Sequence, residues 1–289
     1  MALISRKFLL SRIFCWILSD RTVCNPMVKS LAFVSGKGGV GKTCLAVNSA
    51  INLALMGFKV AVLDTDFGLS NANIMMGVKS DNTISDFLSG SNSFEDIICN
   101  SHGGVKLIPG GSGTLETLNL DTEQRWKIIR SLDVLENDLD YLIVDTPAGA
   151  SNSSIEFASA VDQVVITLVG EPTSFMDAYA FLKALHIEKE VSRFSIVINM
   201  AKNETSAFRD FKSFEKIVLK FFPVQLAFAG WMPGSNDVVQ SIIARKPFIL
   251  DKKTKKQVGT CLDVITNNLN KVPRQKKSGI HFFSSETGY

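Results

Sequence analysis

The stretch SGKGGVGKT, from Ser35 to Thr43, constrains the fold of this chain more than any other. It fits the pattern G-x-x-x-x-G-K-[ST], with Gly36 and Gly41 as the spaced glycines and Lys42 before the final hydroxyl. An apolar run precedes it and a helical pattern follows, which is the context in which this pattern forms a phosphate-binding loop. Glycines let backbone N–H groups curl around a polyphosphate, and the helix N-terminus adds positive potential. The stretch therefore predicts a strand–loop–helix unit that binds a nucleotide.

Short apolar runs alternate with helical patterns along the rest of the chain. The runs are mostly continuous, as in strands that are covered on both faces. They predict strands at residues 31–35, 60–64, 105–109, 141–145, 164–169, 195–199 and 226–231. Apolar residues at helical spacing predict helices over 47–55 and 175–185, the second capped by Thr173 or Ser174, and a third helix over 208–221.

This order of elements predicts an α/β fold, a doubly wound and mostly parallel sheet with helices on both faces. Hydrophobic residues make up 46% of the 289, which is enough for a sizeable core in one large domain. Ligands of such sheets bind at the carboxyl ends of the strands. We therefore look for functional residues at those ends.

We divide the chain into an N-terminal extension at 1–26, a nucleotide-binding domain at 27–272 and a flexible C-terminal tail at 273–289. The extension contains the basic and apolar run RKFLLSRIFCWIL, which is too short to span a bilayer. Three interpretations of it stay open. An upstream start codon was chosen in place of Met27, the segment is an amphipathic contact to a membrane or partner, or it is an export signal.

Charge and cysteine usage narrow the function classes. A net charge of +3 does not suggest a dedicated nucleic-acid binder. The cysteines are odd in number, and no two have CxxC spacing: Cys15, Cys24, Cys44, Cys99 and Cys261. This usage is typical of a reduced cytoplasmic protein, and it argues against a disulfide framework and against a zinc or iron–sulfur site.

Aspartates end two of the predicted strands. Asp64 and Asp66 stand in VAVLDTDFGLSN, and Asp145 stands in YLIVDTPAGAS. Carboxylates in such places hold Mg²⁺ or its waters, and one of them can orient an attacking water. Strand-end aspartates also cap helices, which is the simpler alternative. Because three carboxylates are expected at one sheet edge, we favour the functional interpretation.

The loop carries a second lysine, Lys37, in addition to Lys42. Lys42 is committed to phosphates in its own site, whereas Lys37 stands at the start of the loop and its side chain can leave it. One use is to reach the nucleotide of a facing copy and neutralise transition-state charge there. A solvated surface lysine is the alternative, and spacing alone does not decide between them.

With this second lysine, GKGGVGKT resembles the deviant Walker A motif of the MinD/ParA superfamily of P-loop ATPases. The resemblance implies an ATP- and Mg²⁺-dependent homodimer in which Lys37 contacts the partner's nucleotide and Asp66 orients water. It implies Thr43, Asp64 and Asp145 around the metal. It also implies an adenine contact from Asn199 and from the segment around Pro233. The expected nucleotide-binding residues are Gly36, Lys37, Gly38, Gly39, Val40, Gly41, Lys42, Thr43, Cys44, Asn199 and Pro233.

Within the superfamily, GEPTSFMDAYAFLKAL at 170–185 resembles the corresponding segment of the FlhG/FleN group, MinD-like ATPases that control flagellar number and placement. TISDFLSG at 83–90 fits as well. There are departures. The glutamine-containing N-terminal motif of FlhG proteins is not found, and Asn236 stands where an aspartate is more usual. The C-terminal PRQKKSGIHFF resembles the start of a membrane-binding segment, with a disordered tail as the alternative.

The resemblance leads us to expect a slow ATPase that acts as a dimer switch in flagellar placement or cell-pole organisation, with a flagellar or polar partner protein. We expect it in the cytoplasm, with a peripheral position on the inner face of the membrane left open. The alternative is a ParA-type partition ATPase that binds DNA without sequence preference through the lysines of 252–256, although we do not favour DNA as a partner. An iron–sulfur carrier of the same fold lacks the paired cysteines that it needs.

Overall fold

The computed structural model describes residues 28–68, 71–111, 120–274 and 279–283. The strands are β1 (Lys29–Val34), β2 (Val60–Asp64), β3 (Cys99–Asn100), β4 (Lys106–Ile108), β5 (Tyr141–Asp145), β6 (Gln163–Val169), β7 (Arg193–Ala201) and β8 (Gln225–Pro233). The α-helices are α2 (Lys42–Leu55), α3 (Ala72–Met76), α4 (Ile84–Leu88), α6 (Thr122–Ser131), α7 (Asn152–Ser159), α8 (Pro172–Lys189), α9 (Glu204–Leu219), α10 (Asn236–Ile243) and α11 (Lys252–Lys271). Short 3₁₀ turns lie at Glu95–Ile97, His102–Gly104, Leu132–Asp138 and Phe248–Leu250.

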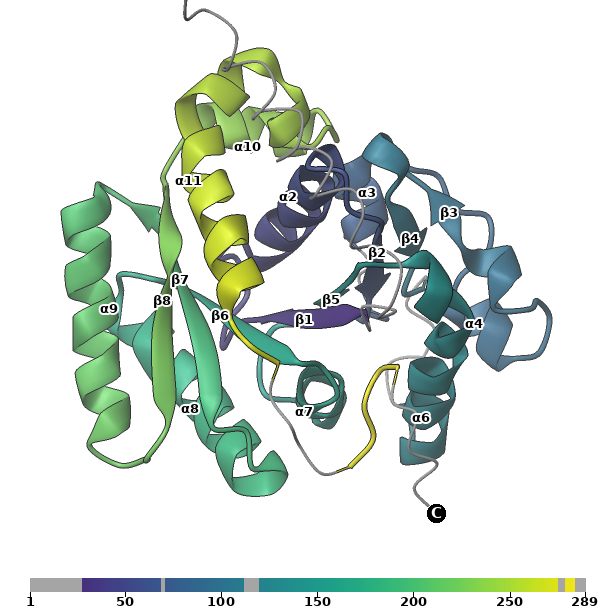
Figure 1. The fold of residues 1–289 in the computed structure, drawn as a ribbon, viewed down its shortest axis with the longest axis horizontal. Helices are drawn as coiled ribbons and strands as arrows, with labels where there is room; N and C mark the ends of the chain where they lie inside the picture. The colour runs from purple at the N-terminus through teal and green to yellow at the C-terminus, as the bar shows by residue number, and fades with distance from the viewer. Residues whose placement is uncertain (1–27, 69–70, 112–119, 275–278, 284–289) are drawn as a thin grey trace, which may run out of the picture.

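The strands form one sheet in the order β3-β4-β2-β5-β1-β6-β7-β8 (Figure 1). The pairs from β4 to β8 are parallel, and β3 alone pairs antiparallel, with β4. The predicted doubly wound, mostly parallel α/β fold is therefore confirmed. Strand β1 lies between β5 and β6 in the interior of the sheet, so the loop that follows it opens at the centre of the carboxyl edge.

Helices cover both faces of the sheet, each over its own apolar layer. One layer holds apolar side chains of α6, α7, α8 and α9, among them Ile128, Phe157, Phe181 and Phe214. The other holds side chains of α2, α3 and α11, such as Ile51 and Leu262. The strand residues are buried almost throughout because helices exclude water from both faces, which explains their continuous apolar runs.

Two local features differ from the sequence analysis. The edge strand β3 was not predicted, because two residues are too short to show a strand pattern. Helix α8 begins at Pro172, and its N-cap position is Glu171 rather than Thr173 or Ser174. The Ser174 hydroxyl instead accepts a hydrogen bond from the backbone N–H of Val169 at 3.1 Å, which ties the first turn of α8 to the end of β6.

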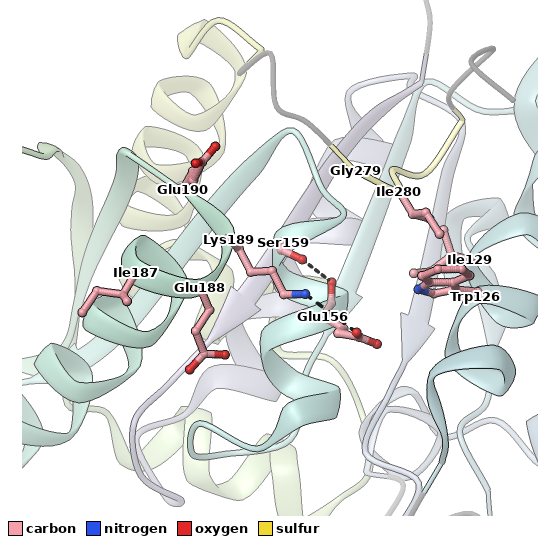
Figure 2. Close-up of a pocket in the computed structure, with 10 residues that line it drawn as sticks. All are labelled: Trp126, Ile129, Glu156, Ser159, Ile187, Glu188, Lys189, Glu190, Gly279 and Ile280. Atoms are coloured by element: carbon pink, nitrogen blue, oxygen red, sulfur yellow. Dashed lines mark hydrogen bonds and ion pairs between the residues drawn. The ribbon is translucent and has the colours of Figure 1, made fainter. Parts of the chain in front are cut away.

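The C-terminal residues 279–283 pack against the domain, which corrects our expectation of a flexible tail at this point. Phe282 and Phe283 are only 5% and 3% exposed and belong to the layer of α6–α9. The backbone N–H of Phe282 donates to the carbonyl of Ala160 at 3.0 Å. Figure 2 shows Ile280 beside Trp126 at the edge of a cavity of about 460 Å³. In this structure the two phenylalanines are therefore not available to a membrane.

The proposed extension at 1–26 lies outside the described residues, as does the rest of the tail at 275–278 and 284–289. Within the described part of the chain, no helix is both long and apolar enough to cross a bilayer.

Candidate nucleotide-binding site

The loop from Gly36 to Gly41 joins β1 to α2 and requires glycine at both ends. A Cβ on Gly36 would lie 2.1 Å from the backbone carbonyl carbon of Asp177 in α8, closer than any side chain can approach. Gly41 has a φ of +84°, and a Cβ there would lie 2.3 Å from the side-chain nitrogen of Asn199. The two glycines therefore let the loop fit closely between α8 and β7.

Helix α2 presents its N-terminus to this loop. Its first backbone bond runs from the N–H of Leu45 to the carbonyl of Gly41 at 3.0 Å. The N–H groups of Lys42, Thr43 and Cys44 precede that bond, and such groups at a helix start have no partner within the helix. They can donate to phosphate oxygens, and the helix dipole favours negative charge there. The predicted role of these residues in nucleotide binding thus has a geometric basis.

Lys42 is buried in the site and paired with a carboxylate. Its ammonium lies 2.5 Å from Asp145 Oδ1 and 3.3 Å from the hydroxyl of Thr43. The side chains are only 7% and 1% exposed for Lys42 and Asp145, so each charge depends on the other for compensation. A polyphosphate brought to the loop would offer Lys42 further anionic oxygens and leave Asp145 beside the same cation and hydroxyl.

Asp64 and Asp145 lie side by side, because β2 and β5 are neighbours and the two residues are in register. Together with the Thr43 hydroxyl, which contacts the same Lys42 ammonium as Asp145, they supply the oxygen ligands that Mg²⁺ prefers. Asp64 also organises the following loop, since its carboxylate accepts from the backbone N–H of Asp66 at 3.0 Å and of Ala72 at 3.1 Å. Among the described residues no group of three or more His, Cys, Asp or Glu could hold a metal by itself. The oxygen donors of Thr43, Asp64 and Asp145 fit Mg²⁺.

Asp66 stands two residues beyond the strand end, in a cavity of about 370 Å³ between the loops that follow β2 and β5. The cavity is also lined by Arg125 of α6 and Ser151, the N-cap of α7. Arg125 is 7% exposed, and its guanidinium donates to Glu156, to the Leu120 carbonyl and to the Thr122 hydroxyl. Sequence reasoning missed this arginine, because its partners come from α6 and α7 and no local motif marks it.

Lys37 points away from its own loop. Its ammonium lies 2.7 Å from Glu171 Oε2 and donates to the Thr173 hydroxyl at 3.2 Å. The lysine side chain is 30% exposed and the glutamate side chain 61%. The structure thus joins the second lysine of the loop to the Glu-Pro-Thr segment, two features that the sequence analysis treated separately. The only sequence signal for this ion pair was an acidic residue, Glu171, at the start of a helix that touches the loop.

Asn199 supports the loop directly, since its side-chain amide donates to the carbonyl of Val40 at 2.7 Å. Pro233 ends β8, the neighbour of β7, and is paired in register with Ala201. It therefore lies one strand further from the loop than Asn199. Both residues lie at the carboxyl edge, and their contact with the base stays a prediction. The hydrogen bond of Asn199 holds the loop in place.

Cys44 is buried in the first turn of α2. Burial raises the pKa of its thiol to about 12, against a smaller opposite effect of the Asn48 side chain. A thiol with this pKa stays protonated and unreactive at neutral pH. Any contact of this residue with a nucleotide would therefore come from its backbone.

A central strand, a glycine loop, a helix N-terminus and a buried Lys–Asp pair define a P-loop nucleotide-binding protein. Residues 27–269 match the family model described as "ParA: NUBPL iron-transfer P-loop NTPase". The chain therefore belongs to the ParA/MinD family of P-loop NTPases, as its deviant Walker A motif predicted.

Two relatives and one solved structure are similar to this chain. It is 34% identical to the antiactivator FleN of Pseudomonas aeruginosa over 215 residues, which cover 74% of this chain and 77% of FleN. It is 38% identical to the flagellum site-determining protein YlxH of Helicobacter pylori over 164 residues, 54% of this chain and 53% of YlxH. The solved structure of the septum site-determining protein MinD of Pyrococcus horikoshii, complexed with Mg-ADP, has a TM-score of 0.67 at 19% identity and covers 85% of this chain and 97% of that one.

Proposed function

We propose that this protein is a Mg²⁺-dependent ATPase whose ATP-bound form dimerises, and that the dimer acts as a switch in controlling flagellar number or placement. The relatives FleN and YlxH support the flagellar assignment. Because these relatives carry the sequence identity, we do not retain the partition alternative. We do not propose iron transfer, since no two cysteines of the sequence have the CxxC spacing of a paired cluster ligand.

The placement of Lys37 carries the proposal of a dimer. Its ammonium is turned toward Glu171 and the surface, so it does not serve the phosphates of its own loop in this structure. In a dimer, the Lys37 ammonium of each copy would reach the nucleotide that is bound to the facing copy. There it would neutralise charge that develops on the transferred phosphoryl group. The dimer would then be required for catalysis rather than merely accompany it.

Within each site, the N–H groups at the start of α2 and the Lys42 ammonium would bind the phosphates. Thr43, Asp64 and Asp145 would hold Mg²⁺, which when bound neutralises phosphate charge. Asp66, in the cavity between the two loops, would orient the attacking water. A partner protein that contacts this cavity could change the hydrolysis rate.

The test is the ATPase rate per molecule as a function of protein concentration, for the wild type and for Lys37→Ala. We expect a rate that rises with concentration in the wild type and stays low in the variant. Lys59→Ala is the matched control, because Lys59 is exposed just before β2, at the opposite end of the strands. A rate per molecule that is independent of concentration and of Lys37 would refute the dimer mechanism.

A further inference from the structure

Helix α10 displays apolar side chains that the fold does not use. None of its residues is buried, and Val239 and Ile243 are 50% and 67% exposed. They stand four residues apart and so share one face of the helix. Val238 and Ile242 lie about 100° away around the helix, on the side toward the domain, and pack against the layer of α2 and α11. The helix is therefore anchored by one apolar pair and presents a second pair to the outside.

A cluster of lysines lies beside this helix, at the start of α11. Lys252, Lys253, Lys255 and Lys256 are all exposed. Cations at a helix N-terminus oppose the helix dipole, so these lysines weaken the helix that they begin. The stability of the fold does not explain these lysines. Their position therefore points to a role in binding another molecule.

The two elements form one surface, which we call the α10 surface and define as residues 236–256. Lys253 pairs with Asp237 at 3.0 Å, which joins the start of α11 to α10, and Figure 1 shows the two side by side at the top of the molecule. The surface contains six Lys or Arg and two Asp, an excess of four positive charges. The whole chain has a net charge of only +3, so positive charge is concentrated here.

We propose that the α10 surface binds a bilayer that contains anionic phospholipids. Exposed aliphatic side chains that are flanked by lysines are the composition of surfaces that insert into the boundary between headgroups and acyl chains. A nucleic acid would use the lysines but would gain little from Val239 and Ile243. The proposal goes beyond the dimer switch and does not depend on it, because a single chain presents the whole surface.

This location differs from the one that the sequence suggested. The apolar residues of the C-terminal segment, Phe282 and Phe283, are buried against the domain. The segment 279–283, drawn in yellow in Figure 1, lies beside α6 and α7, away from α10 at the top of the molecule. Variants of the α10 surface therefore test this membrane-binding site without changing the C-terminal segment.

The test is co-sedimentation of the full chain with phosphatidylcholine vesicles with or without phosphatidylglycerol, in the presence and absence of Mg-ATP. One variant combines Val239→Gln and Ile243→Gln, and a second combines Lys255→Gln and Lys256→Gln. We expect binding that needs phosphatidylglycerol and weakens with salt. The lysine variant should bind about 30-fold more weakly, if each lysine contributes as membrane-surface lysines usually do. The apolar variant should also lose binding.

The matched controls are Val264→Gln, at a side chain that is 51% exposed further along α11, and the pair Lys216→Gln with Lys220→Gln on and just after α9. These controls should bind like the wild type, and the ATPase rate without vesicles should be unchanged in the α10-surface variants. The proposal is overturned if the wild type fails to bind, if it binds neutral vesicles equally well, or if all variants bind alike. Retention on DNA that depends on the lysines but not on Val239 and Ile243 would assign the surface to a nucleic acid instead.

Discussion

Replacing Phe282 by alanine should destabilise the whole domain, although the residue stands only seven positions from the C-terminus. Its side chain is 5% exposed and packs in the same apolar layer as Phe157. An aromatic side chain buries 150–250 Å², and Phe→Ala changes in cores cost about 3–5 kcal/mol once the cavity is included. If this segment were a flexible tail, the same change would leave the free energy of unfolding almost unchanged.

Urea unfolding, followed by circular dichroism without nucleotide, measures this change. With a slope of about 3 kcal/mol per molar, the midpoint should fall by about 1 M or more. The control is Phe221→Ala, just beyond α9, where the ring is 59% exposed and the change should stay within about 1 kcal/mol. Equal midpoints for Phe282→Ala and the wild type would refute the packing of this segment in the core.

Three further outcomes follow from the nucleotide site. Glu171→Gln should release Lys37 from an exposed ion pair that contributes about 0–1 kcal/mol. The protein concentration for half-maximal ATPase activity should then fall by up to about fivefold, with little change in stability. An unchanged concentration would mean that Glu171 does not restrain the lysine. Lys42→Met should abolish nucleotide binding and cost about 3–5 kcal/mol, because it leaves the Asp145 carboxylate buried and unpaired. Combining it with Asp145→Asn should restore urea stability but not binding of a fluorescent ATP analogue, and failure to restore stability would contradict this account. Iodoacetamide at pH 8 should not alkylate Cys44 in the native protein, since the raised pKa of about 12 keeps the thiol protonated, but it should alkylate Cys44 in urea. An alkylated Cys44 peptide in the mass spectrum of the native digest would contradict this expectation.

Much of the site could be predicted from local sequence alone. The glycine loop, the apolar strand before it and the helix after it are neighbours along the chain, so backbone geometry and local spacing define them together. Asp64 and Asp145 could be placed at one edge because parallel strands end at the same edge, and the structure has them in register on adjacent strands. Expected strands at 60–64 and 141–145 coincide with β2 and β5, since buried runs have sharp ends.

Other features depend on contacts between residues that are distant in the sequence. The pair of Lys37 with Glu171 spans 134 residues, and the support of the P-loop by Asn199 spans 159. Neither has a local pattern, because each arises only when β1, β6 and β7 become neighbours in the sheet. For the same reason, the apolar and basic residues near the C-terminus are as compatible with a membrane-binding segment as with a segment that packs on the domain. Only the tertiary structure shows Phe282 bonded to Ala160. The sequence by itself determined the chemistry of the loop and the strands, whereas the tertiary structure decided which side chains that chemistry meets, since apolar patterns specify burial but not the partner against which a residue is buried.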